Sequence, residues 1–302
     1  MNQDLNKPSK PNDVSEHLGE GESPQVLQYL IGLIQIPRPI NCAITFFSVL
    51  LGGWLGTLTL SNSLLLAAIS ATLITGGGNV LNDLCGLQED RINKPQRPLP
   101  AGIVSSTMAI ILTFFLLLGG LILGFLLPSP APWIVLVAVI ALIGYNFWLK
   151  RVPLLGNLVV SALGGLAFVY GGFAAHAYPP SRWPALFAVL FHLGREILKD
   201  LEDIPGDQVL MGSTIPLSWG KSTARILITG IYATLMILTP LPALIDIYGN
   251  IYFALACLLN LLLIYVLIRL RQASTPKILR HLNHTLKGGM ILGLLAFFFD
   301  RL

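Results

Sequence analysis

Two stretches of the chain hold most of its acidic residues and mark where chemistry is expected. Residues 82–100 read NDLCGLQEDRINKPQRPLP, and residues 195–207 read REILKDLEDIPGD. Together they carry eight of the 15 Asp and Glu residues, in a chain where only 11% of residues are charged. Such a concentration of ionisable groups in an otherwise apolar chain predicts a functional site.

Within the first stretch, the acidic side chains are spaced to share one face of a helix. Asp83 and Asp90 are seven residues apart, with Gly86 at the turn between them and Asn82 at the border of the face. The second stretch repeats this spacing between Asp200 and Asp207. Two carboxylate faces at the same depth repel each other unless a cation joins them.

Magnesium is the cation that best fits such a pair of faces. It prefers oxygen ligands and usually binds through one or two carboxylates together with substrate phosphates. We therefore predict a Mg²⁺ site, with Asp83, Asp90, Asp200 and Asp203 also counted as catalytic residues. Its predicted ligands are Asn82, Asp83, Asp90, Asp200, Asp203 and Asp207.

Basic residues accompany both stretches, namely Arg91, Lys94, Arg97, Arg195 and Lys199. Charge-assisted hydrogen bonds from such side chains suit phosphate oxygens. We expect Arg97, Arg195 and Lys199 to bind a substrate diphosphate. A solvated loop with surface ion pairs would need no function, but the matching spacing in two distant places favours a site.

The composition is that of a polytopic membrane protein with an all-α fold. Hydrophobic residues make up 54% of the 302, and the mean hydropathy is +0.73. Apolar runs of about 18 residues or more can cross roughly 30 Å of hydrocarbon. The three cysteines lie far apart inside apolar runs, so neither a disulfide framework nor a metal-ligand spacing is visible.

We predict nine transmembrane helices around a central cavity. An amphipathic segment from residue 25 leads into the first span, which ends near residue 58. The others are expected at about residues 64–84, 104–127, 133–149, 155–175, 183–201, 223–241, 251–268 and 282–299. Residues 1–24 are polar and are predicted to form a disordered tail, and residues 25–302 a single membrane domain.

The basic residues indicate the orientation in the membrane. With the N-terminus in the cytoplasm, seventeen of the 19 Lys and Arg residues fall on the inner side, leaving Arg182 and Arg301 outside. Both acidic stretches then lie at the cytoplasmic face of the cell membrane. Because the net charge of +4 is distributed in this way, it marks orientation and does not indicate a nucleic-acid partner.

A diphosphate site that opens into a lipid-filled helix bundle suits an allylic isoprenoid diphosphate. The charged head would bind at the metal and the apolar tail between the helices. Magnesium and basic side chains would stabilise the departing diphosphate, and an acceptor would capture the allylic carbocation. A bundle lined by apolar residues would keep water out.

The two stretches resemble the UbiA-type membrane prenyltransferases, whose motifs are Asn-Asp-x-x-Asp-x-x-x-Asp and Asp-x-x-Asp-x-x-x-Asp. An Arg-Pro-x-Asn pattern at residues 38–41 adds to a resemblance that covers about residues 25–302. It implies Mg²⁺-dependent prenyl transfer. It also implies roles in substrate binding for Asn41, Tyr145, Lys150 and Arg151. For Tyr145, Lys150 and Arg151 the alternative is an interfacial anchor, and Asn157 either lines the cavity or bonds another helix.

The segments after the two motifs are most similar to members of the family that act in ether-lipid synthesis. The resemblance then implies geranylgeranyl diphosphate as donor and the hydroxyl of geranylgeranylglyceryl phosphate as acceptor. The acceptor's phosphate needs a cation, for which Lys150, Arg151 and Lys287 are candidates. Because the second motif is also similar to that of homogentisate prenyltransferases, an aromatic acceptor of the homogentisate or 4-hydroxybenzoate type stays open.

One departure from the family pattern bears on activity. Gly86 stands where the family has its second aspartate, and Glu89 is expected only at the edge of the carboxylate face. Metal binding would then rest on fewer ligands. A catalytically lapsed lipid-binding protein therefore stays open, as does an ion-coupled transporter, because acidic residues in membrane helices also mark ion paths.

Overall fold

The chain folds as a bundle of α-helices in a computed structural model that describes residues 22–209, 213–273 and 275–302. The disordered tail predicted for residues 1–24 falls outside the described residues up to position 21. The helices are α1 (Glu22–Gln35), α2 (Pro39–Thr57), α3 (Asn62–Cys85), α4 (Leu87–Asn93), α5 (Ser106–Phe125), α6 (Ala131–Phe147), α7 (Leu155–Ala174), α8 (Arg182–Val209), α9 (Ile215–Ser218), α10 (Lys221–Leu238), α11 (Leu241–Leu244), α12 (Asn250–Gln272) and α13 (Pro276–Phe299), with 3₁₀ turns η1 (Leu149–Arg151) and η2 (Pro179–Ser181).

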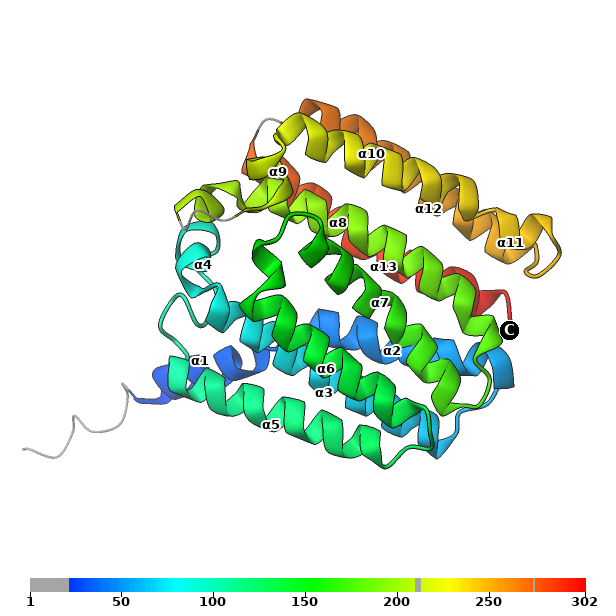
Figure 1. Cartoon of the computed structure of the whole chain (residues 1–302), viewed down its shortest axis with the longest axis horizontal. Coiled ribbons are helices and arrows are strands. Elements are labelled where there is room, and N and C mark those ends of the chain that lie inside the picture. The colour runs from blue at the N-terminus through cyan, green and yellow to red at the C-terminus, as the bar shows by residue number, and fades with distance from the viewer. Residues whose placement is uncertain (1–21, 210–212, 274) are drawn as a thin grey trace, which may run out of the picture.

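Long helices run side by side and enclose the interior of the bundle (Figure 1). Neighbouring pairs in contact are α2 with α3, α3 with α6, α6 with α7, α7 with α8 and α8 with α13. The contact between α13 and α2 closes the ring. α5 packs outside α3, and α10 and α12 pack outside α8 and α13. Each acidic stretch therefore lies at the end of a helix that faces the interior.

Nine helices of at least 17 residues coincide with the nine predicted ranges in the described part of the chain. Among the described residues, seven stretches are long and apolar enough to cross a membrane, one of which joins α1 and α2. α6 is apolar but has only 17 residues, and α8 carries the charged second stretch. The all-α membrane fold is confirmed, whereas the count of nine spans stays a prediction.

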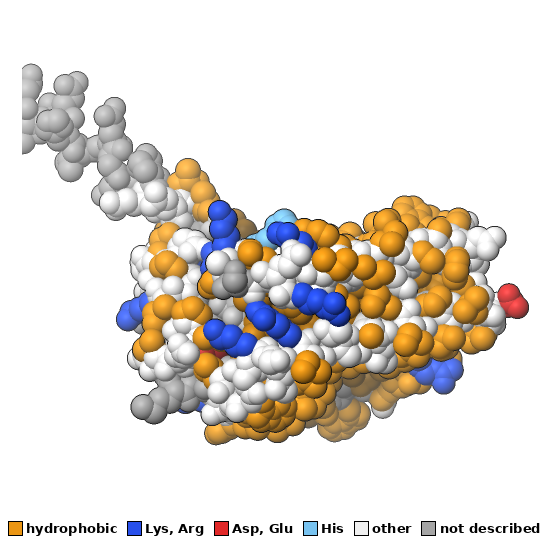
Figure 2. Space-filling model, turned by 90° about the horizontal axis from the view of Figure 1, so that it is seen from above, with side chains coloured by type: hydrophobic (Ala, Val, Ile, Leu, Met, Phe, Trp, Pro, Cys, Tyr) orange, Lys and Arg blue, Asp and Glu red, His pale blue; other side chains and the backbone are white. Residues whose placement is uncertain are grey.

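The surface agrees with a membrane environment. Large hydrophobic side chains are exposed on the surface of the bundle, for example Phe114, Phe115, Trp133 and Ile237. In Figure 2, hydrophobic side chains cover much of the face in view, and Lys and Arg side chains gather mainly on its left half. This separation of charge from apolar surface is typical of an integral membrane protein.

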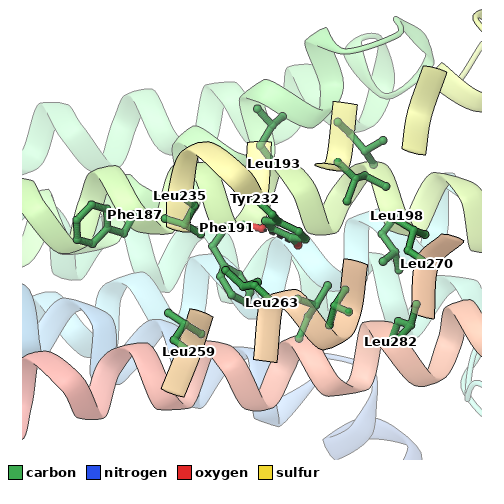
Figure 3. Close-up of a cluster of buried hydrophobic side chains, with 14 of the residues drawn as sticks. Phe187, Phe191, Leu193, Leu198, Tyr232, Leu235, Leu259, Leu263, Leu270 and Leu282 are labelled. Carbon is green, nitrogen blue, oxygen red and sulfur yellow. Dashed lines mark hydrogen bonds between the residues drawn. The ribbon is translucent and has the colours of Figure 1, made fainter. Parts of the chain in front are cut away.

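A cluster of buried side chains fixes α8 against the outer helices. Phe191 of α8, Tyr232 of α10, Leu263 of α12 and Leu282 of α13 meet in this cluster (Figure 3). Lipid tails are as apolar as leucine, so dense van der Waals packing holds such a contact together in the membrane. The cluster holds the helix that carries the second acidic stretch.

Candidate active site

The first acidic stretch does not continue one helix, contrary to the expectation of a single helical face. α3 ends at Cys85, Gly86 lies between the helices, and α4 begins at Leu87. Despite this break, Arg97 brings the acids together. Its Nη1 atom donates to Asp83 Oδ1 at 3.1 Å and to Asp90 Oδ2 at 2.6 Å.

Asp83 is almost completely buried, with 2% of its surface exposed. Arg38 donates a second hydrogen bond to its Oδ1 atom. Arg38 precedes α2 with φ at 60°, a left-handed conformation that costs energy for any residue other than glycine. The sequence contained the Arg-Pro pattern at this position, but it did not reveal the ion pair with Asp83.

In the second stretch, α8 continues to Val209, eight residues beyond the predicted end at Leu201. Its aspartates therefore lie on one continuous helix. Asp200 accepts a hydrogen bond from Asn157 Nδ2 of α7 at 2.9 Å. Asp203 accepts from Lys94 Nζ at 2.6 Å with both carboxylate oxygens. Asp207 lies beyond the predicted span, and burial raises its pKa to about 7, with the negative charge of Asp203 adding to the rise.

Asn93 connects the two acidic stretches through side-chain hydrogen bonds. Its Nδ2 atom donates to the backbone oxygen of Asp203 at 2.8 Å, and its Oδ1 atom accepts from the backbone nitrogen of Gly206 at 3.0 Å. Arg280 of α13 donates to the backbone oxygen of Asn93 at 3.1 Å and to Glu202 at 3.1 Å. The end of α4 is thus held against α8 and α13. The spacing of the acidic residues in the sequence did not indicate a role for Asn93.

Two adjoining cavities contain these groups. The first, the main cavity, has a volume of about 430 Å³ and extends from charged residues to apolar side chains of α6 and α7, among them Val135, Leu142 and Leu163. The second, the acidic cavity, contains the aspartates of both stretches except Asp83. The residues that line both are Arg38, Asn82, Lys94, Arg97, Tyr145, Glu196 and Lys199.

Most of the predicted site residues come together around these cavities. The main cavity holds Asn41, Asn82, Arg97, Tyr145, Arg195 and Lys199. The acidic cavity holds Asn82, Asp90, Arg97, Tyr145, Lys150, Asn157, Lys199, Asp200, Asp203 and Asp207. Asp83 lies behind Arg38 and Arg97, and Arg151 in η1 has an exposed side chain away from both cavities. The role of each residue stays a prediction.

Glu196 and Lys287 stand out among the other charges of the main cavity. Glu196 is 6% exposed and accepts from Lys199 Nζ at 2.6 Å and from Arg195 Nη1 at 3.2 Å. Lys287 of α13 also lines this cavity, yet it makes no ion pair with any residue that the structure describes. An unpaired ammonium group beside Arg195 favours binding of an anion.

A third, apolar cavity adjoins the main cavity. It lies between α8, α10, α12 and α13, with Phe187, Phe191, Gly293 and Leu294 among its lining residues. The two cavities share Ile44, Ser48, His192 and Met290. An apolar chain that enters from the charged end can therefore continue along the main cavity or turn into the apolar cavity.

The donor set agrees with a hard divalent cation. The acidic cavity presents carboxylate and amide oxygens, and the buried Oδ1 atom of Asn82 has no hydrogen-bond partner among the described residues. Within the same residues, no group of three or more His, Cys, Asp or Glu side chains is arranged to hold a metal. Lys94 and Arg97 instead bind the carboxylates. By donor type, the residues fit Mg²⁺.

The chain matches known proteins along most of its length. Residues 43–285 match the model of the UbiA prenyltransferase family. The chain is 35% identical over 266 residues to digeranylgeranylglyceryl phosphate synthase of Methanopyrus kandleri, covering 87% of this chain and 97% of that protein. It is 31% identical to the synthase of the same name from Methanosphaera stadtmanae, with the same two coverages.

Solved structures show the same fold. A digeranylgeranylglyceryl phosphate synthase structure superposes with a TM-score of 0.70 at 29% identity, covering 90% of this chain and 98% of that one. A UbiA homolog from Archaeoglobus fulgidus bound to GPP and Mg²⁺ superposes with a TM-score of 0.62 at 16% identity, covering 88% and 99%.

Proposed function

This chain belongs to the UbiA prenyltransferase family of intramembrane enzymes, and on that premise we propose that it makes an ether lipid. The reaction transfers a geranylgeranyl group from its diphosphate to the hydroxyl of geranylgeranylglyceryl phosphate. Relatives named digeranylgeranylglyceryl phosphate synthase, matched along 97% of their length, support this choice. The observation that carries it is the acidic cavity, which joins both acidic stretches and opens into a largely apolar main cavity.

The acidic cavity binds the donor's diphosphate. Asn82, Asp90, Asp200, Asp203 and Asp207 would hold magnesium there. When bound, the metal neutralises the diphosphate and makes it a better leaving group. Structures of UbiA homologs bound to GPP or DMAPP with Mg²⁺ support this part of the proposal.

Basic side chains exchange partners when the diphosphate binds. Lys94 and Arg97 contact carboxylates at 2.6 Å, and both line the two cavities. Phosphate oxygens accept the same charge-assisted hydrogen bonds. Magnesium on the carboxylates and phosphate on the bases would replace the carboxylate–base pairs without leaving a charge unpaired. Asp83 stays behind and orients Arg38 and Arg97.

The prenyl chain of the donor lies along the apolar wall of the main cavity, and its distal end extends into the adjoining apolar cavity. As the carbon–oxygen bond to the diphosphate breaks, the allylic carbocation forms in a region from which apolar side chains exclude water. The acceptor hydroxyl, positioned next to this carbon, then forms the new ether bond and gives its proton to the departing diphosphate. Water exclusion decides whether the product is an ether or a hydrolysed alcohol.

The acceptor's phosphate binds at Lys287. Of the three candidates named from the sequence, Lys150 is paired with Glu89 at 3.0 Å and Arg151 is exposed away from the cavities. Lys287 lies in the main cavity together with Arg195 and His284, without an acidic partner in the described part of the chain. This site holds the acceptor beside the acidic cavity without competing for the donor's diphosphate.

The protein would act with the N-terminus and the acidic cavity at the cytoplasmic face of the cell membrane. The asymmetry of the basic residues supports this orientation. Both substrates carry long apolar chains, so they would enter from the lipid of the same membrane.

A transfer assay with purified protein tests the function. The protein in detergent receives geranylgeranyl diphosphate, Mg²⁺ and one acceptor at a time: geranylgeranylglyceryl phosphate, homogentisate or 4-hydroxybenzoate. We expect the diether product only with the first, and a loss of at least about 100-fold with Asp203→Asn. Product from an aromatic acceptor would overturn the lipid assignment, and binding of both lipids without product would fit a catalytically lapsed protein.

A further inference from the structure

The two acidic stretches share their spacing but differ at one position. In the second stretch, carboxylates stand at Asp200, Asp203 and Asp207. The corresponding positions of the first stretch are Asp83, Gly86 and Asp90. The middle position of the first stretch therefore has no carboxylate, whereas the first and last positions are aspartates in both stretches.

Another carboxylate fills the space beside Gly86. A Cβ atom built on Gly86 would lie 2.8 Å from Oε2 of Glu89 and 2.8 Å from Nζ of Lys150. Glu89 is three residues further on in α4, and its side chain is only 12% exposed. Glu89 lines the acidic cavity together with Asp90, Asp203 and Asp207. The break at Gly86 and the extra methylene of a glutamate let its carboxylate reach this place.

We propose that Glu89 is a Mg²⁺ ligand that supplies, from α4, the carboxylate absent at position 86. The inference rests on the proposed function, because it assumes that the acidic cavity is the metal and diphosphate site. Lys150 donates to Glu89 Oε2 at 3.0 Å and is the partner that the metal would replace on this carboxylate. Gly86 is then a requirement, since any larger side chain would displace the carboxylate.

The competing explanation is that Glu89 and Lys150 only anchor η1 to α4. The two explanations differ in what each side chain contributes. If the pair is an anchor, removing either partner has the same effect. If Glu89 binds the metal, removing its charge weakens metal binding, whereas removing Lys150 leaves the carboxylate free to bind.

Mn²⁺ binding to the purified full chain, followed by electron paramagnetic resonance without any diphosphate, tests this directly. We expect Glu89→Gln to weaken Mn²⁺ binding by about tenfold to 100-fold, a typical loss at metal sites. Lys150→Met should retain the parental affinity or exceed it. Gln88→Ala changes an exposed neighbour on α4 and serves as the matched control.

Variants that place a carboxylate at position 86 give the sharpest test. Gly86→Asp alone should bind Mn²⁺ no better than the parent, because the new side chain meets Glu89 and Lys150. In the double variant Gly86→Asp/Glu89→Ala, the space is free and affinity should recover relative to Glu89→Ala. Thermal unfolding in detergent shows whether each variant remains folded.

The outcomes separate this inference from the function. If Glu89→Gln binds Mn²⁺ like the parent while Asp203→Asn does not, the inference is overturned and the function stands. If Glu89→Gln loses binding but the parent prenylates an aromatic acceptor, the inference stands and the lipid assignment falls. A parent that binds no Mn²⁺ overturns the inference together with the magnesium dependence.

Discussion

Lys94 donates to both carboxylate oxygens of Asp203 at 2.6 Å, so a base from the first acidic stretch is paired with an acid of the second. The same ammonium group lies 3.9 Å from Asp90 Oδ1. Lys94 therefore stands between two carboxylate groups at the point where the sequence predicted a cation. If a metal and a diphosphate bind here as proposed, this lysine would turn from acid to phosphate.

Replacing Lys94 with methionine should weaken donor binding. A hydrogen bond to a charged group contributes about 1.5–3 kcal/mol, so the KM for geranylgeranyl diphosphate should rise about tenfold or more. Steady-state kinetics with varied donor measure this. Lys277→Met, at an exposed position of α13, is the control and should behave like the parent. An unchanged donor KM would show that Lys94 serves only Asp203.

Replacing Asn93 with alanine should destabilise the protein. The change removes two hydrogen bonds between α4 and α8 and leaves the backbone nitrogen of Gly206 without its partner, at about 1–3 kcal/mol for the unsatisfied group. The midpoint of thermal unfolding in detergent should fall. Asn62→Ala, at an exposed position of α3, provides the comparison. Equal midpoints for the two variants would show that the hydrogen bonds of Asn93 to α8 do not stabilise the fold.

Replacing Lys287 with methionine should affect the acceptor and spare the donor. Loss of a charged contact to the acceptor's phosphate is expected to raise the acceptor KM by about tenfold, with little change in the donor KM. The two constants are measured separately, and Lys221→Met on α10 is the exposed control. A parallel rise in both constants would place Lys287 at the diphosphate instead.

Filling the apolar cavity should change the preferred chain length. A Cβ atom at Gly293 would meet no atom within 4 Å, and Gly293 lines this cavity, so Gly293→Leu is expected to occupy part of it. We expect turnover with the C20 donor to fall by about tenfold relative to a C10 donor. Gly288→Leu is the matched control, because Gly288 has equal space but is exposed and lies outside the cavity lining. A uniform loss across donor lengths would indicate that the donor chain lies elsewhere.

The fold could be predicted from the sequence because its signal is strong and local. Long apolar runs separated by short polar connections gave nine ranges, and each coincides with a long helix. The ends of helices are harder to predict where a polar segment continues an apolar helix. α8 runs to Val209 since its acidic face turns toward a polar cavity and not toward lipid, a tertiary effect that hydropathy does not register. An ion-coupled transporter is no longer needed to explain these acids, given the enzyme family.

The site could be predicted only in part. The sequence located two acidic stretches with equal spacing, and their side chains line one cavity. It did not reveal which partner each acid would have. Arg38, Asn93 and Glu89 owe their positions to contacts with distant helices or to the break at Gly86. Asp83 shows the same limit, because its spacing matches Asp90 while its burial sets it behind two arginines.

The break at Gly86 lets two consecutive helices pack against different neighbours. α3 packs mainly against α5 and α2, whereas α4 packs against α8. α3 can tilt as the bilayer becomes thicker or thinner, a common response to hydrophobic mismatch. α4 is joined to α3 by a single glycine and held to α8 by Asn93. We therefore expect α4 to keep its alignment with α8 in bilayers of different thickness.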